Sequence, residues 1–308
     1  MHPYLHRYLR LVAILAAALL LGGCASAYSE SLPHVSLREL HPLPTASANV
    51  APLRVAVAAI ISPQGTVASY QPLLDYLGLR LNRPVELVQR RTYAEANDLV
   101  RRNEVDLAFV CTRAYVLGAR EFGMELLVIP QVHGQTVYHS VIIVRDDYPA
   151  RTFADLRGSV FAFTDPLSNT GYLYPNVVLK RLGQTADSFF RRSFFTYSHD
   201  RAIDAVAQGL ADAAAVDSLV LDYALARDSR LHSRIRVIDR SPTFGIPPVV
   251  VGPDVRPQLK AALQDILFDM ATDPLGRQAL QALDFERFVP GTDELYASVR
   301  DMEKEWGP

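Results

Sequence analysis

Residues 138–175 read YHSVIIVRDDYPARTFADLRGSVFAFTDPLSNTGYLYP and carry the most informative pattern of the chain. The apolar runs 137–145 and 159–164 are typical of buried strands. The polar stretch DPLSNT follows the second run, and a helix is predicted from Gly171 to about Leu182. A strand, a polar turn and a helix in this order indicate an α/β unit whose turn lies at the carboxyl edge of the sheet.

The same alternation of strand and helix continues on both sides of this stretch. Before it, the sequence predicts strands at 53–60, 84–90, 105–110 and 124–132 and helices at 70–81, 93–102 and 113–122. After it, strands are predicted at 194–198, 213–216 and 246–252 and helices at 200–210, 218–227, 256–272, 276–283 and 293–305. Continuous apolar strands separated by helices predict mostly parallel sheets with helices on both faces.

The order of these elements predicts an α/β fold with two lobes. Residues 52–142 and 247–308 would form a discontinuous first lobe, onto which the last helices pack, and residues 143–246 a second lobe. Two hinge crossovers would join the lobes. Because ligands in open α/β sheets bind beyond the carboxyl ends of strands, two such edges facing each other across a hinge would enclose a binding cleft.

Composition excludes several classes of function. The 308 residues include 31 Lys and Arg against 33 Asp and Glu, a net charge of −2 without a basic block, which disfavours a nucleic-acid binder. Two cysteines rule out a disulfide framework and a cysteine-based zinc cluster, and the eight histidines lack metal-ligand spacing. We therefore expect neither a metal nor a cofactor.

Catalysis is not expected either. Motifs such as GxSxG, HExxH, GxxxxGK, GxGxxG and CxxC do not occur. Ser168 and His199 could be considered as a nucleophile and its base. However, Ser168 stands among other hydroxyl and amide donors at a predicted helix start, which favours holding an anion.

The N-terminal residues predict export and lipidation. Residues 1–23 begin with His and Arg and continue into the apolar run 11–21, whose helix of roughly 16 Å is too short for a hydrocarbon core of about 30 Å. LGGC, ending at Cys24, resembles the bacterial lipobox, which implies acylation of Cys24. Residues 24–51, rich in Ser, Ala and Pro, would form a flexible tether. We thus expect a lipid-anchored, extracytoplasmic protein, and Ala25 does not resemble an inner-membrane retention signal.

Several separated motifs resemble the phosphonate/phosphite/phosphate-binding proteins of ABC importers, a family of class II periplasmic binding proteins. The main motif runs Asp-Pro-x-Ser-(Thr/Asn)-(Ser/Thr)-Gly-(Tyr/Phe)-Leu-x-Pro and matches residues 165–175. VDLAFVCTRAYV at 105–116, SHDRAIDAVAQGLADAAAVDS at 198–218 and FGIPPVVV at 244–251 follow the family in order. The resemblance covers about 53–275 and implies a protein that delivers a small phosphorus oxyanion to an ABC permease.

Ser168, Asn169 and Thr170 are the central site candidates. They lie at the start of a predicted helix, where backbone N–H groups lack intrahelical partners and the helix dipole is positive. An anion there would accept these N–H bonds together with the two hydroxyls and would need no Lys or Arg. The alternative is a simple helix cap, because Ser, Asn and Thr are common N-cap residues. The family resemblance favours the anion site.

Three further candidates follow strands of the second lobe. His199 matches the family's histidine position and would donate to an anion oxygen; alternatively it is a surface histidine. Asp217 would accept a proton from a P–OH group, or a bond from a ligand amine, and would repel sulfate; it would otherwise serve as an N-cap. Ser218 would donate beside it.

The first lobe contributes aromatic candidates. Tyr93 and Tyr115 match positions where the family places phenols over the ligand, and Tyr138 starts a crossover strand; each of these rings could instead simply pack. Thr112 is a further donor at a helix start. The run Cys111–Arg113 departs from the Gly or Ser with Pro that many relatives have here, so Arg113 would add a charge at the mouth of the site.

Two other functions remain open at this stage. The same lobes could report the ligand to a membrane kinase or cyclase, or they could bind another small acid, such as a sulfonate. In each case we expect a monomer without nucleic-acid partners.

Overall fold

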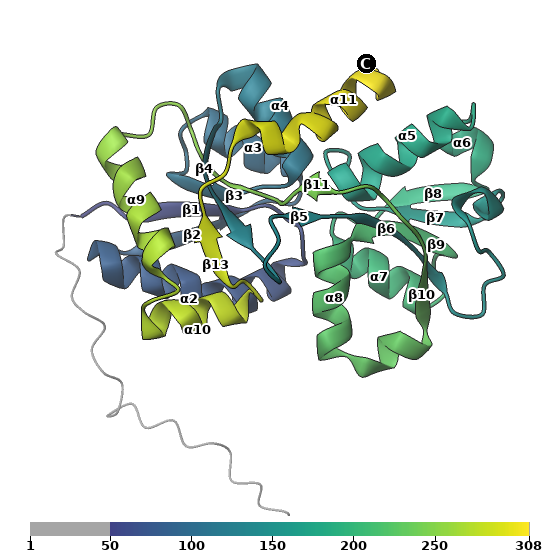
Figure 1. Ribbon diagram of the computed structural model, residues 1–308, viewed down its shortest axis with the longest axis horizontal. Coiled ribbons are helices and arrows are strands. Elements are labelled where there is room, and N and C mark those ends of the chain that lie inside the picture. Colours follow the sequence, from purple (N-terminus) through teal and green to yellow (C-terminus); the bar gives the residue numbers. More distant parts are fainter. Residues whose placement is uncertain (1–49, 308) are drawn as a thin grey trace, which may run out of the picture. The chain divides into compact units, whose positions relative to one another are not determined.

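The structure, a computed structural model, describes residues 50–307 (Figure 1). The predicted signal peptide, Cys24 and nearly all of the predicted tether lie outside the described residues. Within residues 50–307 no helix has the length and apolarity needed to cross a membrane.

A six-stranded sheet forms the core of what we call lobe 1, with strand order β13-β4-β12-β3-β1-β2. Its strands are β1 (Leu53–Val57), β2 (Val85–Gln89), β3 (Leu107–Phe109), β4 (Glu125–Gln131), β12 (Val249–Val251) and β13 (Arg287–Val289). Its helices are α2 (Pro63–Leu81), α3 (Tyr93–Arg101), α4 (Thr112–Phe122), α9 (Pro257–Asp269) and α10 (Pro274–Ala282). β1 pairs parallel with β2 and β3, but β12 is antiparallel to β3 and β4 because the chain re-enters this sheet from the other lobe. The sheet is therefore mixed.

A five-stranded sheet with strand order β10-β6-β9-β7-β8 forms lobe 2. Its strands are β6 (Ser140–Arg145), β7 (Val160–Phe163), β8 (Arg192–Phe195), β9 (Ala213–Asp217) and β10 (Ile235–Arg240). Its helices are the π-helical turn η2 (Asn169–Leu173), α5 (Tyr174–Arg181), α6 (Ala186–Phe189), α7 (His199–Ala207) and α8 (Ser218–Arg227), with short 3₁₀ turns at Phe153–Leu156 and Ser229–Ser233. β7, β8 and β9 run parallel, whereas β6 and β10 are antiparallel to their neighbours.

Two crossing segments connect the sheets. The predicted strand 137–145 breaks at His139 into β5 (Val137–Tyr138) and β6, because β5 pairs with β11 (Phe244–Gly245) rather than with the lobe 2 sheet. Figure 1 shows this two-stranded ribbon between the sheets. The Ser140 N–H donates to Ser241 Oγ at 2.8 Å, which ties the outgoing segment to the returning one.

The C-terminal segment contacts both lobes. After the 3₁₀ turn η4 (Asp293–Tyr296), helix α11 (Ala297–Trp306) packs against α4 of lobe 1 and α5 of lobe 2. Arg181 of α5 forms two hydrogen bonds of 2.7 Å with the Glu305 carboxylate. The last helix therefore packs onto the first lobe, as expected, and also contacts the second.

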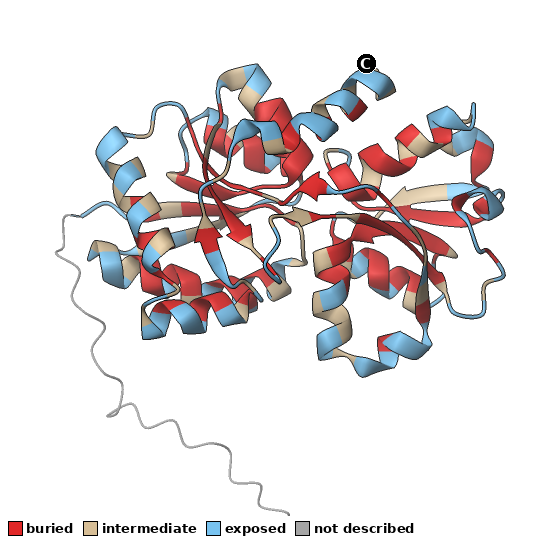
Figure 2. Cartoon of the chain, in the orientation of Figure 1, coloured by how far each residue is buried: buried red, intermediate tan, exposed pale blue. Residues whose placement is uncertain are grey.

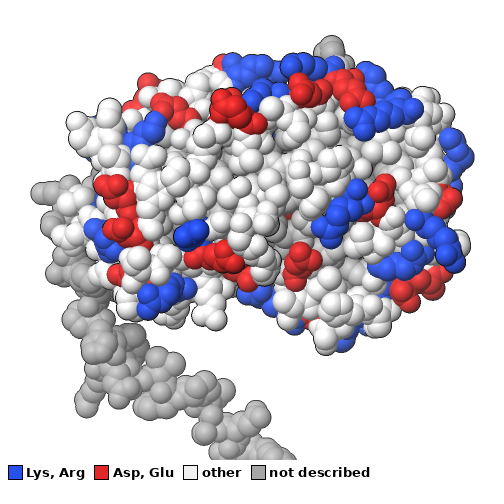
Figure 3. All heavy atoms as spheres, in the orientation of Figure 1, with Lys and Arg blue, Asp and Glu red and all other residues white. Residues whose placement is uncertain are grey.

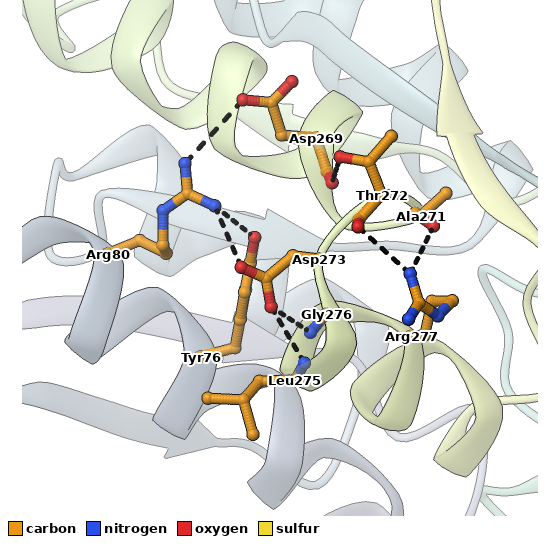
Figure 4. A network of polar contacts seen from close by, with 9 residues as sticks. All are labelled: Tyr76, Arg80, Asp269, Ala271, Thr272, Asp273, Leu275, Gly276 and Arg277. Atoms are coloured by element: carbon orange, nitrogen blue, oxygen red, sulfur yellow. Dashed lines mark hydrogen bonds and ion pairs between the residues drawn. The ribbon is translucent and has the colours of Figure 1, made fainter.

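Apolar strands supply most of the interior. Figure 2 shows buried residues concentrated on the strands and on the helix faces that turn toward them. One cluster in lobe 1 packs α2 against β1 and β3 through Leu73, Leu77 and Leu107, all fully buried. Outside that core, the Arg80 guanidinium lies 3.7 Å from carboxylate oxygens of both Asp269 and Asp273 (Figure 4). Asp273 also caps α10, so these contacts fasten α2 to the α9–α10 pair.

Candidate functional site

The turn after β7 begins with an aspartate that organises the backbone. Asp165 Oδ1 accepts the Leu167 N–H at 2.8 Å, and the Asp165 carbonyl accepts the Ser168 N–H at 2.8 Å. Ser168 Oγ then caps the next turn by accepting the Gly171 N–H at 3.0 Å. The helix starts at Asn169 as a π-helical turn and not at Gly171 as predicted. Such turns occur often at functional sites.

Gly171 lets this turn approach the end of β7. A Cβ at this position would lie 1.9 Å from Thr164 Oγ1, so any side chain would force the turn away from the strand. The Thr170 carbonyl accepts a bond from Ser140 Oγ at 2.7 Å, which fixes the turn against β6. The Thr170 N–H has no hydrogen-bond partner among residues 50–307. A backbone donor is thus held at the sheet edge with its bonding capacity unused.

Lobe 1 meets this turn directly. The Tyr93 N–H donates to Asp165 Oδ2 at 3.1 Å, and the Asn169 N–H donates to Cys111 Sγ at 3.5 Å. Asn169 Nδ2 donates to the Tyr138 hydroxyl at 3.2 Å, whereas Asn169 Oδ1 and the Tyr93 hydroxyl are buried without a partner. Burial raises the pKa of Tyr93 well above its usual value, and the nearby Cys111, Asp165 and Tyr138 raise it further. Polar groups of both lobes therefore share one buried location.

His199 is held as a neutral donor. Its Nδ1 accepts the Asp217 N–H at 3.0 Å, so the proton of the neutral ring is on Nε2. Burial lowers the pKa of His199 to about 3, so the ring remains uncharged at neutral pH. The backbone N–H of His199 donates to the Ile60 carbonyl of lobe 1 at 2.9 Å. The ring thus offers one N–H without a positive charge.

Asp217 is buried and pairs with no cationic side chain of the described residues. Its Oδ1 accepts the Leu219 N–H at 2.7 Å and caps α8, which by itself would lower the pKa of the carboxyl. Burial is the larger effect and raises the pKa of Asp217 to about 7. At neutral pH this carboxyl exists in both protonation states, so it can either donate or accept a proton. The N-cap and the titratable acid are therefore the same residue.

The comparisons with known proteins identify the family. A family model described as the ABC transporter, phosphonate, periplasmic substrate-binding protein matches residues 55–296. The chain belongs to this family. The phosphate-import protein PhnD of Mycolicibacterium smegmatis (strain ATCC 700084 / mc(2)155) is 31% identical over 219 residues, which cover 60% of this chain and 68% of the relative.

Two solved structures are similar in fold. The binding protein component of an ABC phosphonate transporter from Pseudomonas aeruginosa has a TM-score of 0.77 at 20% identity, covering 82% of this chain and 85% of that one. PhnD1 of Prochlorococcus marinus in complex with methylphosphonate has a TM-score of 0.75 at 18% identity, covering 82% and 97%. The resemblance and the two-lobed fold of a class II periplasmic binding protein are thus confirmed. The chain is an extracytoplasmic substrate-binding protein of the phosphonate/phosphate ABC importer family, and the alternatives of a sensor or a sulfonate binder are not favoured.

Seven of the predicted site residues of this binding protein lie in the cluster where the lobes meet. They are Tyr93, Tyr138, Ser168, Asn169, Thr170, His199 and Asp217, and each has at most 3% of its surface exposed. Hydrogen bonds link Asn169 to Tyr138 and His199 to Asp217, and Asp217 lies near enough to Tyr93 and Tyr138 to raise the pKa of both hydroxyls.

The other three predicted residues have structural partners. The Tyr115 hydroxyl donates to Asp293 Oδ1 at 2.9 Å, and its ring packs on Tyr296 at a centroid distance of 4.8 Å. Thr112 Oγ1 donates to the Gly245 carbonyl at 2.8 Å, and Ser218 Oγ accepts the His139 N–H at 3.1 Å. We therefore leave Tyr115 out of the proposed site and assign Ser218 to the support of the crossovers. Thr112 also borders the cluster, because its buried side chain lies close enough to the Tyr138 hydroxyl to lower the pKa of that group.

Arg113 does not add a free charge at the mouth of the site. Its guanidinium pairs with Glu303, donates through Nη1 to the Pro166 carbonyl at 2.6 Å and lies 4.8 Å from the Trp306 ring. The side chain is 5% exposed. Its charge is thus neutralised within the protein, and the residue links α4, the turn after β7 and α11.

Sequence reasoning missed three polar residues at the same edge. Asp165 appeared only as part of the motif, although its carboxylate binds the backbone of both lobes. Thr164 Oγ1 and Ser198 Oγ are buried without a partner. The available signal was position, since each follows the carboxyl end of β7 or β8.

The arrangement is suited to an anion that binds without a metal ion. Among residues 50–307 no cluster of His, Cys, Asp and Glu could hold a metal ion. The groups with unused capacity include neutral donors, namely the Tyr93 hydroxyl, the His199 imidazole N–H and the Thr170 backbone N–H, and one acceptor, Asn169 Oδ1. A cavity of about 110 Å³ with mostly apolar walls, including Ile60 and Val220, extends between the lobes from Asp217.

Proposed function

We propose that this binding protein holds a small phosphorus oxyanion (phosphonate, phosphite or phosphate) at the cluster formed by Ser168, Asn169, Thr170, His199 and Asp217, beneath Tyr93 and Tyr138. The observation that supports the site is that the hydroxyls of Tyr93, Thr164 and Ser198 and the amide oxygen of Asn169 are buried where the lobes meet without a partner among residues 50–307. An unpaired buried polar group costs about 1–3 kcal/mol, so such a concentration of them indicates a missing partner. An oxyanion would accept bonds from the hydroxyls, and a P–OH group would donate to Asn169 Oδ1.

Asp217 supplies the proposed selectivity. A carboxyl with a pKa of about 7 shares one proton with a phosphorus acid, either as carboxylate and P–OH or as carboxylic acid and dianion. Sulfate has no proton to share, so it can pair only with the protonated form of Asp217, whereas a phosphorus acid can pair with either form. The proposed site therefore discriminates against sulfate increasingly as the pH rises above 7.

Binding without catalysis is proposed for the same cluster. Ser168 Oγ accepts from Gly171, and His199 Nδ1 accepts from Asp217, so neither atom is arranged as a nucleophile with its base. Hydrolysis of a chromogenic phosphate ester by the wild type but not by Ser168→Ala would contradict this proposal.

The double variant Ser168→Ala/Thr170→Ala tests the site. We expect it to weaken binding of the best ligand among phosphate, phosphite, methylphosphonate and aminoethylphosphonate by several kcal/mol, because charge-assisted hydrogen bonds contribute about 1.5–3 kcal/mol each. Isothermal titration calorimetry measures the loss. Ser159→Ala is the matched control, since Ser159 is equally buried but precedes the opposite end of β7. Wild-type affinity in the double variant would place the site elsewhere.

We also propose that residues 1–23 are a signal peptide, that Cys24 carries lipid, and that residues 24–51 tether a monomer to a bacterial membrane. The lobes in this proposal comprise residues 52–142 with 247–308 and residues 143–246. The lipobox-like LGGC supports the anchor. Expressed in a lipoprotein-processing host, the full chain should appear in the membrane fraction with an acylated N-terminus by mass spectrometry. Cys24→Ser should release it to the soluble fraction; an unchanged distribution would refute the anchor.

A further inference from the structure

A larger cavity lies between the lobes next to the proposed oxyanion site. Its volume is about 540 Å³, within the range of small-molecule sites. Its lining includes Arg90, Arg91 and Thr92 from lobe 1 and Tyr197, Ser198 and Arg201 from lobe 2. Thr92 and Ser198 directly precede the proposed site residues Tyr93 and His199, so two residues of the lining are chain neighbours of the oxyanion cluster.

The lining carries an excess of positive charge. None of the three arginines takes part in an ion pair within the described part of the chain. The single acidic residue of the lining, Glu95, uses its carboxylate to accept the N–H groups of Arg91 and Thr92 at 2.9 and 3.1 Å. On the face drawn in Figure 3, basic and acidic side chains are interleaved.

Ser198 gives a second indication of a ligand. It is 1% exposed, its Oγ has no hydrogen-bond partner among residues 50–307, and it lines the cavity. The preceding Tyr197 has a φ of +60°, a left-handed conformation that an aromatic residue rarely adopts. Two bonds hold this backbone: the Tyr197 N–H donates to the Thr164 carbonyl at 2.8 Å, and Thr196 Oγ1 donates to the Ser198 carbonyl at 2.9 Å. These hydrogen bonds stabilise the strained conformation of Tyr197, which in turn positions Ser198.

We propose that this cavity is a subsite for a second anionic group, a carboxylate or phosphoryl group, on the substituent of a phosphonate or phosphate ester. Guanidinium groups bind planar carboxylates and phosphoryl oxygens through paired N–H donors, and the Ser198 hydroxyl adds a neutral donor. The inference rests on the proposed function, because the phosphorus head must occupy the neighbouring cluster. The mostly apolar 110 Å³ cavity at Asp217 gives an acidic substituent no comparable partner.

Calorimetry with ligands of matched length tests the subsite. We expect 3-phosphonopropionate and propane-1,3-bisphosphonate to bind about tenfold more tightly than propylphosphonate, a modest gain because all three arginines are solvent-exposed. The two acidic ligands distinguish a carboxylate from a phosphoryl preference. In Arg90→Gln/Arg91→Gln/Arg201→Gln this gain should fall below about twofold while the affinity for methylphosphonate stays within about twofold of wild type.

A second triple variant, Arg120→Gln/Arg191→Gln/Arg234→Gln, makes the same change in charge outside the cavity and should retain the gain. Equal affinities of wild type for the acidic ligands and propylphosphonate would overturn the subsite while leaving the proposed function intact. If the cavity triple variant lost as much affinity for methylphosphonate as for the acidic ligands, the subsite would also be overturned. The arginines would then attract every anion through their charge and would not bind a second acidic group. Failure of every phosphorus ligand to bind the wild type would overturn the proposed function and the subsite together.

Discussion

Asp217 shows how one buried residue couples ligand choice to folding. Its pKa of about 7 lies above the value of 3.8 for an exposed aspartate, so folding favours the protonated form. Such a group contributes stability below pH 4 that is lost as the pH rises through 7. His199 acts in the opposite direction: its pKa of about 3, lowered by burial from 6.5, contributes stability above pH 6.5 that is lost as the pH falls toward 3.

The variant Asp217→Asn isolates the first of these contributions. We expect its free energy of unfolding, relative to wild type, to rise by on the order of 3 kcal/mol between pH 4 and pH 8, because the asparagine has no charge to bury. Urea unfolding across this range measures the difference. Asp254→Asn, a change at an exposed aspartate, should follow the wild-type profile. Parallel curves for Asp217→Asn and wild type would show that burial does not control the titration of Asp217.

The success of the site predictions depends on how far along the chain the hydrogen-bond partners of each residue lie. His199 and Asp217 directly follow predicted strands and Ser168 lies in the turn after one, and that position alone brings them to one sheet edge. The hydroxyl of Tyr115 and the guanidinium of Arg113 bind Asp293 and Glu303, which lie 178 and 190 residues further along the chain. A pattern within one element cannot reveal partners at that distance. Tyr115 was therefore assigned to the ligand and Arg113 to the mouth of the site.

At the scale of the element, the helix after β7 was predicted, but its first turn was not. Periodicity predicts that residues near 171–182 are helical, but it does not distinguish an α-turn from the π-helical turn η2 that precedes α5. In the wider turn the Leu173 N–H donates to the Ser168 carbonyl at 3.0 Å, and the Thr170 N–H has no partner among the described residues. The glycine in the motif is required by the approach of this turn to Thr164.

Gly171→Ala should separate the turn from β7. We expect the free energy of unfolding to fall by about 2–4 kcal/mol. An added methyl group in a packed core costs energy of this order, and here it would meet three atoms of Thr164 within 2.8 Å. Ligand affinity should fall as well, because the donors of the turn move with the backbone. Thermal unfolding and calorimetry measure the two effects.

Two further variants control this prediction. Thr164→Ala combined with Gly171→Ala should partly restore stability, because it removes the two nearest of the clashing atoms. Gly65→Ala, where the added Cβ would meet only side-chain atoms at 3.4 Å or more, should be neutral or stabilising in helix α2. Full stability in Gly171→Ala would show that the turn does not need its close approach to Thr164.

At the scale of the whole described chain, bonds from backbone N–H groups of lobe 1 to carboxylates of lobe 2 join the two sheets. Asp165 accepts from Tyr93, and Asp200 accepts the Ser62 N–H at 3.0 Å through both of its oxygens. The side chains of Ser69 and Tyr223 add a direct bond of 2.7 Å. Two apolar clusters lie within single lobes, and a third contains buried residues of both. We expect these polar contacts to affect closure more than folding, because they lie outside the apolar clusters.

Asp200→Ala should therefore weaken closure without unfolding either lobe. Losing the bonds to the Ser62 N–H should raise the dissociation rate of the ligand and weaken its affinity about tenfold, the equivalent of roughly 1.4 kcal/mol. The unfolding free energy should change by less than about 1 kcal/mol, because the residue is only part-buried and no core contact is lost. Stopped-flow binding and small-angle X-ray scattering follow the two states, and the ligand-free variant should have a larger radius of gyration than wild type. Asp204→Ala, on the exposed side of the same helix α7, should leave the dissociation rate, the affinity, the unfolding free energy and the radius of gyration unchanged. An Asp200→Ala protein with wild-type dissociation rate and wild-type scattering would show that the lobes close without this contact.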